Sequence, residues 1–280
     1  MTQYFVWDID RIIFSIPLLF GLEIPIRWYS VTFLIGILGA AMLVHSMFMA
    51  EKKSPRSFEF LPFYIIIGTM LGARLAHVFV YNFSTYMSNP LKIFYVWEGG
   101  LASHGGFLFV ILALVLYSRK HRQEFSFFWL VDRCAIAAMF AAGCIRIGNF
   151  FNSEIIGLPT NVPWAVVFAR VDDLPRHPTQ IYESLGYFYI CLSFYIFYRI
   201  KNRNIGEGRF FGAILISGFL YRAIVERFKE NHTEIVNDLS MNMGQMLSIP
   251  FILMGIYLVL GFHLRSKWWS WGLSTRRLLQ

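Results

Sequence analysis

The stretch from Phe127 to Glu154 decides the fold, and it reads FFWLVDRCAIAAMFAAGCIRIGNFFNSE. Its first part, up to Ile145, is apolar apart from the charged residues Asp132 and Arg133. A helix needs about 20 apolar residues to cross the hydrocarbon core of a membrane. The second part gathers a cation, amides and a carboxylate close together. The stretch therefore predicts a membrane-spanning helix with a polar cluster at one end.

The composition of the whole chain agrees with this interpretation. Of its 280 residues, 56% are hydrophobic and only 15% are charged, and the mean hydropathy is +0.52. A soluble domain carries about 25% charged residues. The same values exclude a disordered chain, a collagen and a small disulfide scaffold. The three cysteines stand in apolar runs without the spacing of a zinc site, so we expect small buried hydrophobes, no metal and no cofactor.

These values predict an all-α polytopic membrane protein with about seven transmembrane helices. The run from Ile12 to Leu22 is too short to span and contains Pro17, so we expect it to lie at the membrane interface. We expect one integral membrane domain over residues 1–280, with an interfacial N-terminal segment at 1–28, a transmembrane core at 29–264 and a cytoplasmic tail at 265–280. The expected spans are Val31 to Ala50, Phe60 to Tyr81, Gly105 to Tyr117, Phe127 to Ile145, Ile181 to Tyr198, Phe211 to Arg227 and Met246 to His263.

The distribution of basic residues predicts the orientation. The connections after the first, third and fifth spans, together with the C-terminal tail, hold 14 of the 25 Lys and Arg residues, and the opposite side holds six. Positive residues favour the cytoplasm, so the N-terminus is expected in the periplasm and the C-terminus in the cytoplasm. The formal charge of +8 is then explained by topology and by contact with membrane lipid, and nucleic acid is not needed as a partner.

Arg146 is the most unusual residue of the opening stretch. An ionisable group at membrane depth costs about 2.5 to 3.5 kcal/mol on insertion scales, so it seldom persists without a partner or a task. Asn149 lies on the same helical face, and Asn152 and Glu154 follow. Either Arg146 pairs with Glu154 while the amides cap the helix, or the four groups bind a polar ligand. The number of groups favours the ligand.

Arg222 and Glu226 form a second polar pair, in the sixth expected span. They are one helical turn apart and face the same way. Either they neutralise each other, or Arg222 is turned toward a ligand and Glu226 positions it. Arg146 is expected at a similar depth on the same side. Two guanidinium groups suit a phosphate, since each can donate bidentately.

Residues 97–106 read WEGGLASHGG, where the chain enters the third expected span. Glycines let a backbone approach a ligand closely, and a helix N-terminus offers free N–H groups to an anion. A histidine ordinarily titrates near neutral pH, so His104 is a candidate for proton transfer. A hydrogen-bonded interfacial histidine is the alternative.

Three further motifs have ordinary structural explanations as well. The stretch from His177 to Glu183, HPTQIYE, opens the fifth expected span with Gln180 and Glu183 on one face, and a structural role is favoured. Arg74 follows Gly72 and is equally well explained as a buried packing arginine. Tyr29 on its own is typical of an aromatic belt residue at the membrane surface.

Taken together, these stretches resemble the prolipoprotein diacylglyceryl transferases. The resemblance runs from residues 27–29, RWY, to residues 242–250, NMGQMLSIP, and its most specific parts are residues 97–106, 143–157 and 177–183. It implies seven transmembrane helices in the bacterial inner membrane, with an active site open to the outer leaflet. It also implies two substrates, phosphatidylglycerol and the lipobox segment of a prolipoprotein. The reaction joins the diacylglyceryl group to the lipobox cysteine as a thioether and releases glycerol 1-phosphate.

The resemblance also implies roles for individual residues. The expected catalytic residues are His104 as the base that takes the thiol proton, and Arg146 and Arg222 as donors to the leaving phosphate. In this interpretation Glu154 and Glu226 hold the arginines, and Asn149 binds a headgroup oxygen. The expected substrate-binding residues are Tyr29, Arg74, Asn149, Asn152, Glu154, Gly157 and Glu226.

Other functions fit the sequence less well. A lipid or small-anion transporter also buries arginines, and it is the main alternative, but related halves are not visible in the sequence. An intramembrane protease would need a serine with a histidine or a pair of aspartates. A phosphotransferase of CDP-alcohols would need a run of aspartates with metal-ligand spacing.

Overall fold

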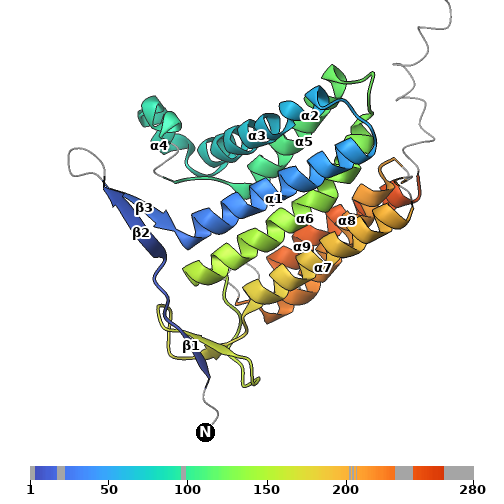
Figure 1. Ribbon diagram of the computed structural model, residues 1–280. Coiled ribbons are helices and arrows are strands. Elements are labelled where there is room, and N and C mark those ends of the chain that lie inside the picture. Colours follow the sequence, from blue (N-terminus) through green and yellow to red (C-terminus); the bar gives the residue numbers. More distant parts are fainter. Residues whose placement is uncertain are drawn as a thin grey trace, which may run out of the picture. The chain divides into compact units, whose positions relative to one another are not determined.

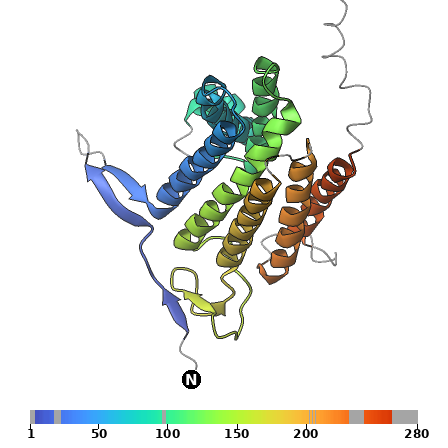
Figure 2. The same ribbon diagram turned by 45° about the vertical axis from the view of Figure 1, so that its right-hand side comes forward.

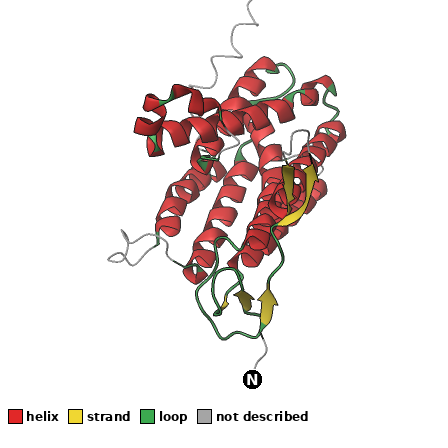
Figure 3. Ribbon diagram, turned by 90° about the vertical axis from the view of Figure 1, so that its left-hand side faces the viewer, coloured by secondary structure: helices red, strands yellow, loops and turns green. Residues whose placement is uncertain are grey.

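The computed structural model describes residues 4–17, 23–95, 99–201, 203, 205, 207–230 and 242–261. Over these residues the fold is mostly helical, with a few short strands (Figure 3). The chain divides into two compact units (Figure 1). The first unit holds Met1–Leu43 and Asp132–Gln280, and the second holds Val44–Val131.

Five helices contribute to the first unit, and among them α8 lies beside both α7 and α9 (Figure 1 and Figure 2). Glycines stand where neighbouring helices touch. A Cβ at Gly143 would meet the Phe188 ring at 2.6 Å, and one at Gly212 would meet the carbonyl oxygen of Gly255 at 2.7 Å. Small residues at such crossings are how helices pack in lipid, where apolar burial gives little drive. The helices are α1 (Trp28–Ala50), α6 (Phe127–Asn152), α7 (Thr179–Ile200), α8 (Arg209–Val225) and α9 (Met243–Val259).

The starts of α8 and α9 are fixed by side-chain caps. The buried carboxylate of Asp132 accepts the backbone N–H groups of Gly208 at 2.9 Å and Phe211 at 2.7 Å. It thereby satisfies donors that the first turn of α8 leaves open. At α9, Asn242 and Gln245 form a reciprocal capping box. A short 3-10 turn, η5 (Glu226–Phe228), follows α8.

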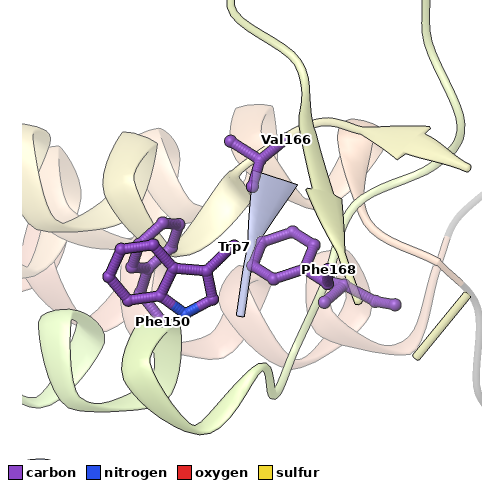
Figure 4. Packing of buried hydrophobic residues seen from close by; sticks show 5 residues of the cluster. Trp7, Phe150, Val166 and Phe168 are labelled. Atoms are coloured by element: carbon purple, nitrogen blue, oxygen red, sulfur yellow. The ribbon is translucent and has the colours of Figure 1, made fainter. Parts of the chain in front are cut away.

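Short strands beside α6 and α7 depart from the all-α expectation. Strand β1 (Phe5–Trp7) pairs in parallel with β4 (Val166–Phe168), and β4 pairs antiparallel with β5 (Pro175–Arg176). Trp7 packs against the ring of Phe150 with centroids 4.4 Å apart, in a cluster that includes Val166 and Phe168 (Figure 4). This apolar cluster attaches the N-terminal strand to the end of α6.

The segment expected to lie at the interface forms part of a β-hairpin. Strand β2 (Ile12–Pro17) pairs antiparallel with β3 (Glu23–Arg27), and residues 18–22 lie outside the described residues. Side chains of both strands, such as Phe14 and Ile24, are exposed. An apolar surface of this kind fits the expected interfacial position, which stays a prediction.

The second unit is built on the pair α3 (Leu61–Ala76) and α5 (Ser103–Lys120). Gly72 and Gly105 face each other so closely that a Cβ on either would collide with the carbonyl oxygen of the other. The buried Tyr117 hydroxyl donates to the carbonyl of Ser57 at 3.1 Å. The remaining elements are α2 (Arg56–Glu59), a π-helical turn η2 (His77–Tyr81), α4 (Phe83–Ser88) and the 3-10 turn η3 (Pro90–Phe94).

Helices form in all seven stretches where spans were expected. Three helical segments are long and apolar enough to cross a membrane by length and composition: Trp28–Ala50, Arg56–Tyr81 and Phe127–Asn152. The described chain is thus a helical membrane protein. The count of seven spans and the single membrane domain stay predictions, and the expected tail at 265–280 lies outside the described residues.

Candidate functional site

The centre of the charged cluster in the first unit is Glu183, in the second turn of α7. Its side chain is fully buried. The Arg146 Nε atom lies 2.9 Å from Glu183 Oε2, and the Lys229 Nζ atom lies 3.0 Å from Oε1. The Tyr187 hydroxyl also donates to Oε1, at 3.3 Å. A buried carboxylate is tolerated only when cations and hydrogen bonds compensate its lost hydration, and Glu183 has both.

The structure pairs Arg146 with a carboxylate that was not expected. The ion pair with Glu154 proposed from the sequence is not formed among the described residues, and Glu183 takes its place. The link to Glu154 is indirect. Arg146 Nη1 donates to Asn149 Oδ1 at 3.3 Å, and Asn149 Nδ2 donates to Glu154 Oε2 at 3.0 Å. The reason is geometric, because Glu154 lies beyond the end of α6, whereas Glu183 of α7 lies beside Arg146.

Glu154 is held in an exposed position by two amides. Asn152 Nδ2 donates to its second oxygen at 3.1 Å, and the bond from Asn149 holds the first. The backbone carbonyl of Glu154 accepts from Gln180 Nε2 at 2.6 Å. The amides therefore fix an exposed carboxylate just beyond the end of α6, and Gln180 of α7 binds the backbone at the same place.

Tyr29 lies near this group from the start of α1. A Cβ at Gly148 would lie 2.5 Å from Thr32 Oγ1 and 2.9 Å from Tyr29 Cδ2, so the two helices touch here. The Tyr29 phenol interacts electrostatically with Glu154 and Arg146. The structure thus brings Tyr29, Arg146, Asn149, Asn152 and Glu154 into one region of the first unit.

At the end of α8, Glu226 pairs with Lys229 and not with Arg222. Lys229 Nζ lies 3.0 Å from Glu226 Oε2, and among the described residues the Arg222 guanidinium forms no hydrogen bond or ion pair. Arg222 and Arg146 both act electrostatically on the Tyr187 phenol, so both lie within electrostatic range of this side chain. The mutual neutralisation of Arg222 and Glu226 allowed by the sequence is therefore not found.

Gly157 has a packing role that its local sequence does not show. A Cβ at this position would overlap His177 and the carbonyl oxygen of Phe228. Its own carbonyl accepts from Arg176 Nη1 at 3.0 Å. The backbone of Gly157 also forms a bridge with Lys229. Gly157 is thus the point where the segments after α6 and α8 meet.

Arg176 closes this loop through two acidic side chains. Its Nε lies 3.1 Å from both oxygens of Asp172, and its Nη1 lies 3.1 Å from Glu230 Oε2. The hydrogen bonds from Arg176 hold the pKa of Asp172 below its usual range. Because the folded-state pKa is lowered, this pair stabilises the fold above the ordinary Asp pKa of about 3.9 and ceases to do so as the pH falls through the folded value.

In the second unit, the exposed His104 side chain bonds the hydroxyl of Tyr81. The distance from Tyr81 Oη to His104 Nε2 is 2.7 Å. Tyr81 lies at the end of η2, and His104 lies at the start of α5. Of the glycines around His104, Gly105 has a packing role. Gly105 lies against Gly72 and Ala76 of α3, so it allows close helix packing and not only the approach of a ligand.

The Arg74 guanidinium binds backbone carbonyl groups. Its five N–H groups are directed at five carbonyl oxygens, and its guanidinium carbon lies 5.0 Å from the ring centre of Tyr86. A guanidinium has five donors in all, so these contacts support the packing alternative. The accepting carbonyls belong to Lys92, Ile93, Tyr95, Gly99 and Gly100.

Sequence reasoning missed the residues that hold the cluster together. The sequence favours a structural role for Glu183 and gives no sign that Lys229 or Tyr187 belongs to the cluster. One signal was available for Glu183, because an acidic residue early in an apolar helix needs a buried partner. The proximity of Lys229 depends on the turn after α8, which no local pattern predicts.

The fold and the cluster define a helical membrane protein that gathers buried cations and carboxylates at the ends of its helices. Within the described residues, no group of His, Cys, Asp and Glu side chains is placed to hold a metal. The family model of prolipoprotein diacylglyceryl transferase matches residues 17–261. The chain belongs to this family.

Similar proteins carry a consistent name. A phosphatidylglycerol–prolipoprotein diacylglyceryl transferase of Chloroherpeton thalassium is 43% identical over 258 residues, which cover 92% of this chain and 94% of that protein. One of Porphyromonas gingivalis is 39% identical over 275 residues, covering 93% and 95%. The similarity therefore extends over nearly the whole length of both chains.

Proposed function

We propose that this chain transfers the diacylglyceryl group of phosphatidylglycerol to the thiol of the lipobox cysteine of a prolipoprotein, as a step in bacterial lipoprotein maturation. The observation that carries the proposal is the guanidinium of Arg222, which has no hydrogen-bond or ion-pair partner among the described residues and acts electrostatically on Tyr187, a hydrogen-bond donor to Glu183. An uncompensated cation at membrane depth is costly, and an anionic lipid headgroup would compensate it. The names of the relatives support the same reaction, and a transporter is not favoured.

The headgroup phosphate is assigned to Arg146 and Arg222. Arg146 uses Nε and one Nη1 bond on Glu183 and Asn149, and its other N–H groups have no partner among the described residues. Arg222 has all of its donors available there. Planar guanidinium groups can donate bidentately to phosphate oxygens, and donors that are already fixed in place stabilise charge as it develops.

The reaction forms one bond and breaks another. The lipobox sulfur attacks the glycerol carbon that carries the phosphodiester, the carbon–oxygen bond breaks, and glycerol 1-phosphate leaves as the thioether forms. The thiol proton must be removed at neutral pH, because a cysteine thiol has a pKa of about 8.5. We assign this proton to His104, which is exposed and is oriented by Tyr81.

The remaining residues of the cluster are assigned to binding. The exposed carboxylate of Glu154, fixed by Asn149 and Asn152, can accept hydrogen bonds from the glycerol hydroxyls of the headgroup. Tyr29 lies beside this carboxylate. Glu226 would act through its ion pair with Lys229, and Gly157 through the close backbone approach that it allows. Arg74, whose donors all face backbone, would contribute by shaping its loop.

We also propose seven transmembrane helices in the bacterial inner membrane, with the N-terminus in the periplasm. The basis is the asymmetry of Lys and Arg between the connections and the helices found in all seven apolar stretches.

The test is transfer of labelled diacylglycerol from phosphatidylglycerol to a lipobox peptide. Arg146→Ala and Arg222→Ala should each lower turnover by at least about a hundredfold, the typical cost of losing one donor to a developing oxyanion. Arg227→Ala is the matched control, because this exposed arginine lies close to Arg222 in sequence. Comparable membrane insertion of all variants must be verified. Normal turnover of either cluster variant would refute the assignment.

A further inference from the structure

Lys229 is a buried cation that bridges two carboxylates. Its side chain is 6% exposed, and its Nζ atom lies 3.0 Å from Glu183 Oε1 and 3.0 Å from Glu226 Oε2. The backbone bridge to Gly157 fixes its position from the other side. A buried lysine is costly unless it is paired, and here two carboxylates compensate it.

The position of Glu226 in the sequence offers its carboxylate two alternative partners, Arg222 and Lys229. Arg222 stands four residues earlier, at the spacing that usually gives an ion pair on a helix. The helix ends at Val225, however, and Glu226 begins the 3-10 turn that leads to Lys229. The turn directs the carboxylate toward Lys229 and against α9, where Gly244 leaves room for it.

The balance of charge in the cluster depends on this choice of partner. Arg146 and Lys229 pair with the carboxylates of Glu183 and Glu226, and Arg222 acts electrostatically on Tyr187, which donates to Glu183. With both carboxylates bound by Lys229, and Glu183 also by Arg146, the remaining positive charge is located on Arg222. Without Lys229, Glu226 would be left with Arg222, which stands four residues earlier, as a partner.

We infer that Lys229 is a positioning residue that holds Glu226 away from Arg222 and so keeps Arg222 available for the anionic headgroup of the lipid substrate. The inference rests on the proposed function for the identity of that lipid. A lysine suits the task because its compact ammonium has three donors that can serve two carboxylates, whereas the planar fork of arginine favours one.

The first variant is Lys229→Met, which keeps the length of the side chain and removes its charge. We expect the KM for phosphatidylglycerol to rise about tenfold with a smaller change in kcat, because one charge-assisted hydrogen bond to the headgroup is lost. Adding Glu226→Gln should reverse most of this rise, since the amide cannot neutralise Arg222. Arg227→Met is the control for loss of a nearby exposed cation, and its KM should not change.

A second route to the same effect leaves Lys229 in place. Gly244→Ala would put a methyl group where the Glu226 carboxylate lies, and the end of a flexible side chain can move away at little cost in stability. We expect the same rise in KM. This variant keeps the inference testable if Lys229→Met does not fold.

The outcomes separate this inference from the proposed function. If the KM of the Lys229→Met and Glu226→Gln double variant equals that of Lys229→Met, Lys229 is only structural and the inference is wrong. Lipid binding is followed in parallel as the rise in Tm that phosphatidylglycerol causes, with phosphatidylcholine as the neutral comparison. A wild-type protein that is stabilised by phosphatidylglycerol but transfers nothing would refute the proposed function. A loss of that stabilisation in Lys229→Met, regained in the double variant, would still support the inference.

Discussion

Three arginines of this chain show how partners decide what a guanidinium can do. Arg74 directs its donors at five backbone carbonyls, so none remains for a ligand. Arg146 is partly used, by Glu183 and Asn149. Arg222 has no hydrogen-bond or ion-pair partner among the described residues. The capacity to bind an anion therefore increases from Arg74 to Arg146 to Arg222.

Arg74→Gln should destabilise the protein by about 2 to 4 kcal/mol, since several backbone carbonyls lose their donor at once. Thermal unfolding in detergent would show the change as a lower Tm. Arg119→Gln is the control, because this arginine is exposed at the end of α5 and should change stability by less than about 0.5 kcal/mol. An unchanged Tm for Arg74→Gln would mean that water replaces the guanidinium without cost.

His104→Gln should lose more activity at neutral pH than at high pH if His104 is the base. At high pH the substrate thiol ionises without help, since its ordinary pKa is about 8.5. The measurement is the pH profile of transfer. Tyr81→Phe removes the bond to Nε2 and should lower kcat with less effect on the amount of folded protein, because Tyr81 is exposed. A uniform loss across pH in His104→Gln would favour a structural role.

At this scale the sequence identifies unusual residues but not their partners. Arg146, Asn149 and Arg222 stand out because polar groups are costly in an apolar helix. The partners Glu183 and Lys229 come from other segments, 37 and 83 residues after Arg146. Their contacts depend on how α7 and the turn after α8 approach α6, which no spacing along the chain encodes.

Glycines at helix crossings determine how closely the elements pack. Helices α3 and α5 meet at Gly72 and Gly105, and helices α8 and α9 meet at Gly212 and Gly255. In lipid such close contact supplies van der Waals attraction that apolar burial does not provide. The helices themselves were predictable from long apolar runs. The strands were not, because β1 and β4 are three residues each and pair across more than 150 residues of chain.

Gly72→Ala should destabilise the protein by about 1 to 3 kcal/mol, because its methyl group would collide with backbone of α5 that cannot move alone. Gly218→Ala is the matched control. It lies within α8, where a Cβ would meet only the Met139 side chain at 3.6 Å, and alanine favours a helix by up to about 1 kcal/mol. The two Tm values should therefore move in opposite directions. A gain in stability for Gly72→Ala would contradict the α3–α5 contact.

For the whole molecule, charge and apolar surface together define the relation to the membrane. Large apolar side chains such as Leu34, Leu38 and Met42 are more than half exposed along α1, which is the surface that lipid covers. The excess of basic residues in alternate connections then predicts which connections lie in the cytoplasm. Composition and charge are global properties, so the membrane class follows from sequence even where individual contacts do not.

Orientation can be tested with single cysteines read by a membrane-impermeant maleimide. The native Cys134, Cys144 and Cys191 would first be replaced by alanine. Lys229 cannot serve as the outer labelling position because its side chain is buried. Asp173 is exposed in a connection expected in the periplasm, and Lys201 is exposed in a connection expected in the cytoplasm. Asp173→Cys should react in spheroplasts, since the proposed orientation puts its loop in the periplasm. Lys201→Cys should react only after the membrane is opened. Reaction of both in detergent shows that neither site is hidden by the fold. Equal labelling in sealed cells would overturn the proposed orientation and, with it, the expectation of an active site open to the outer leaflet.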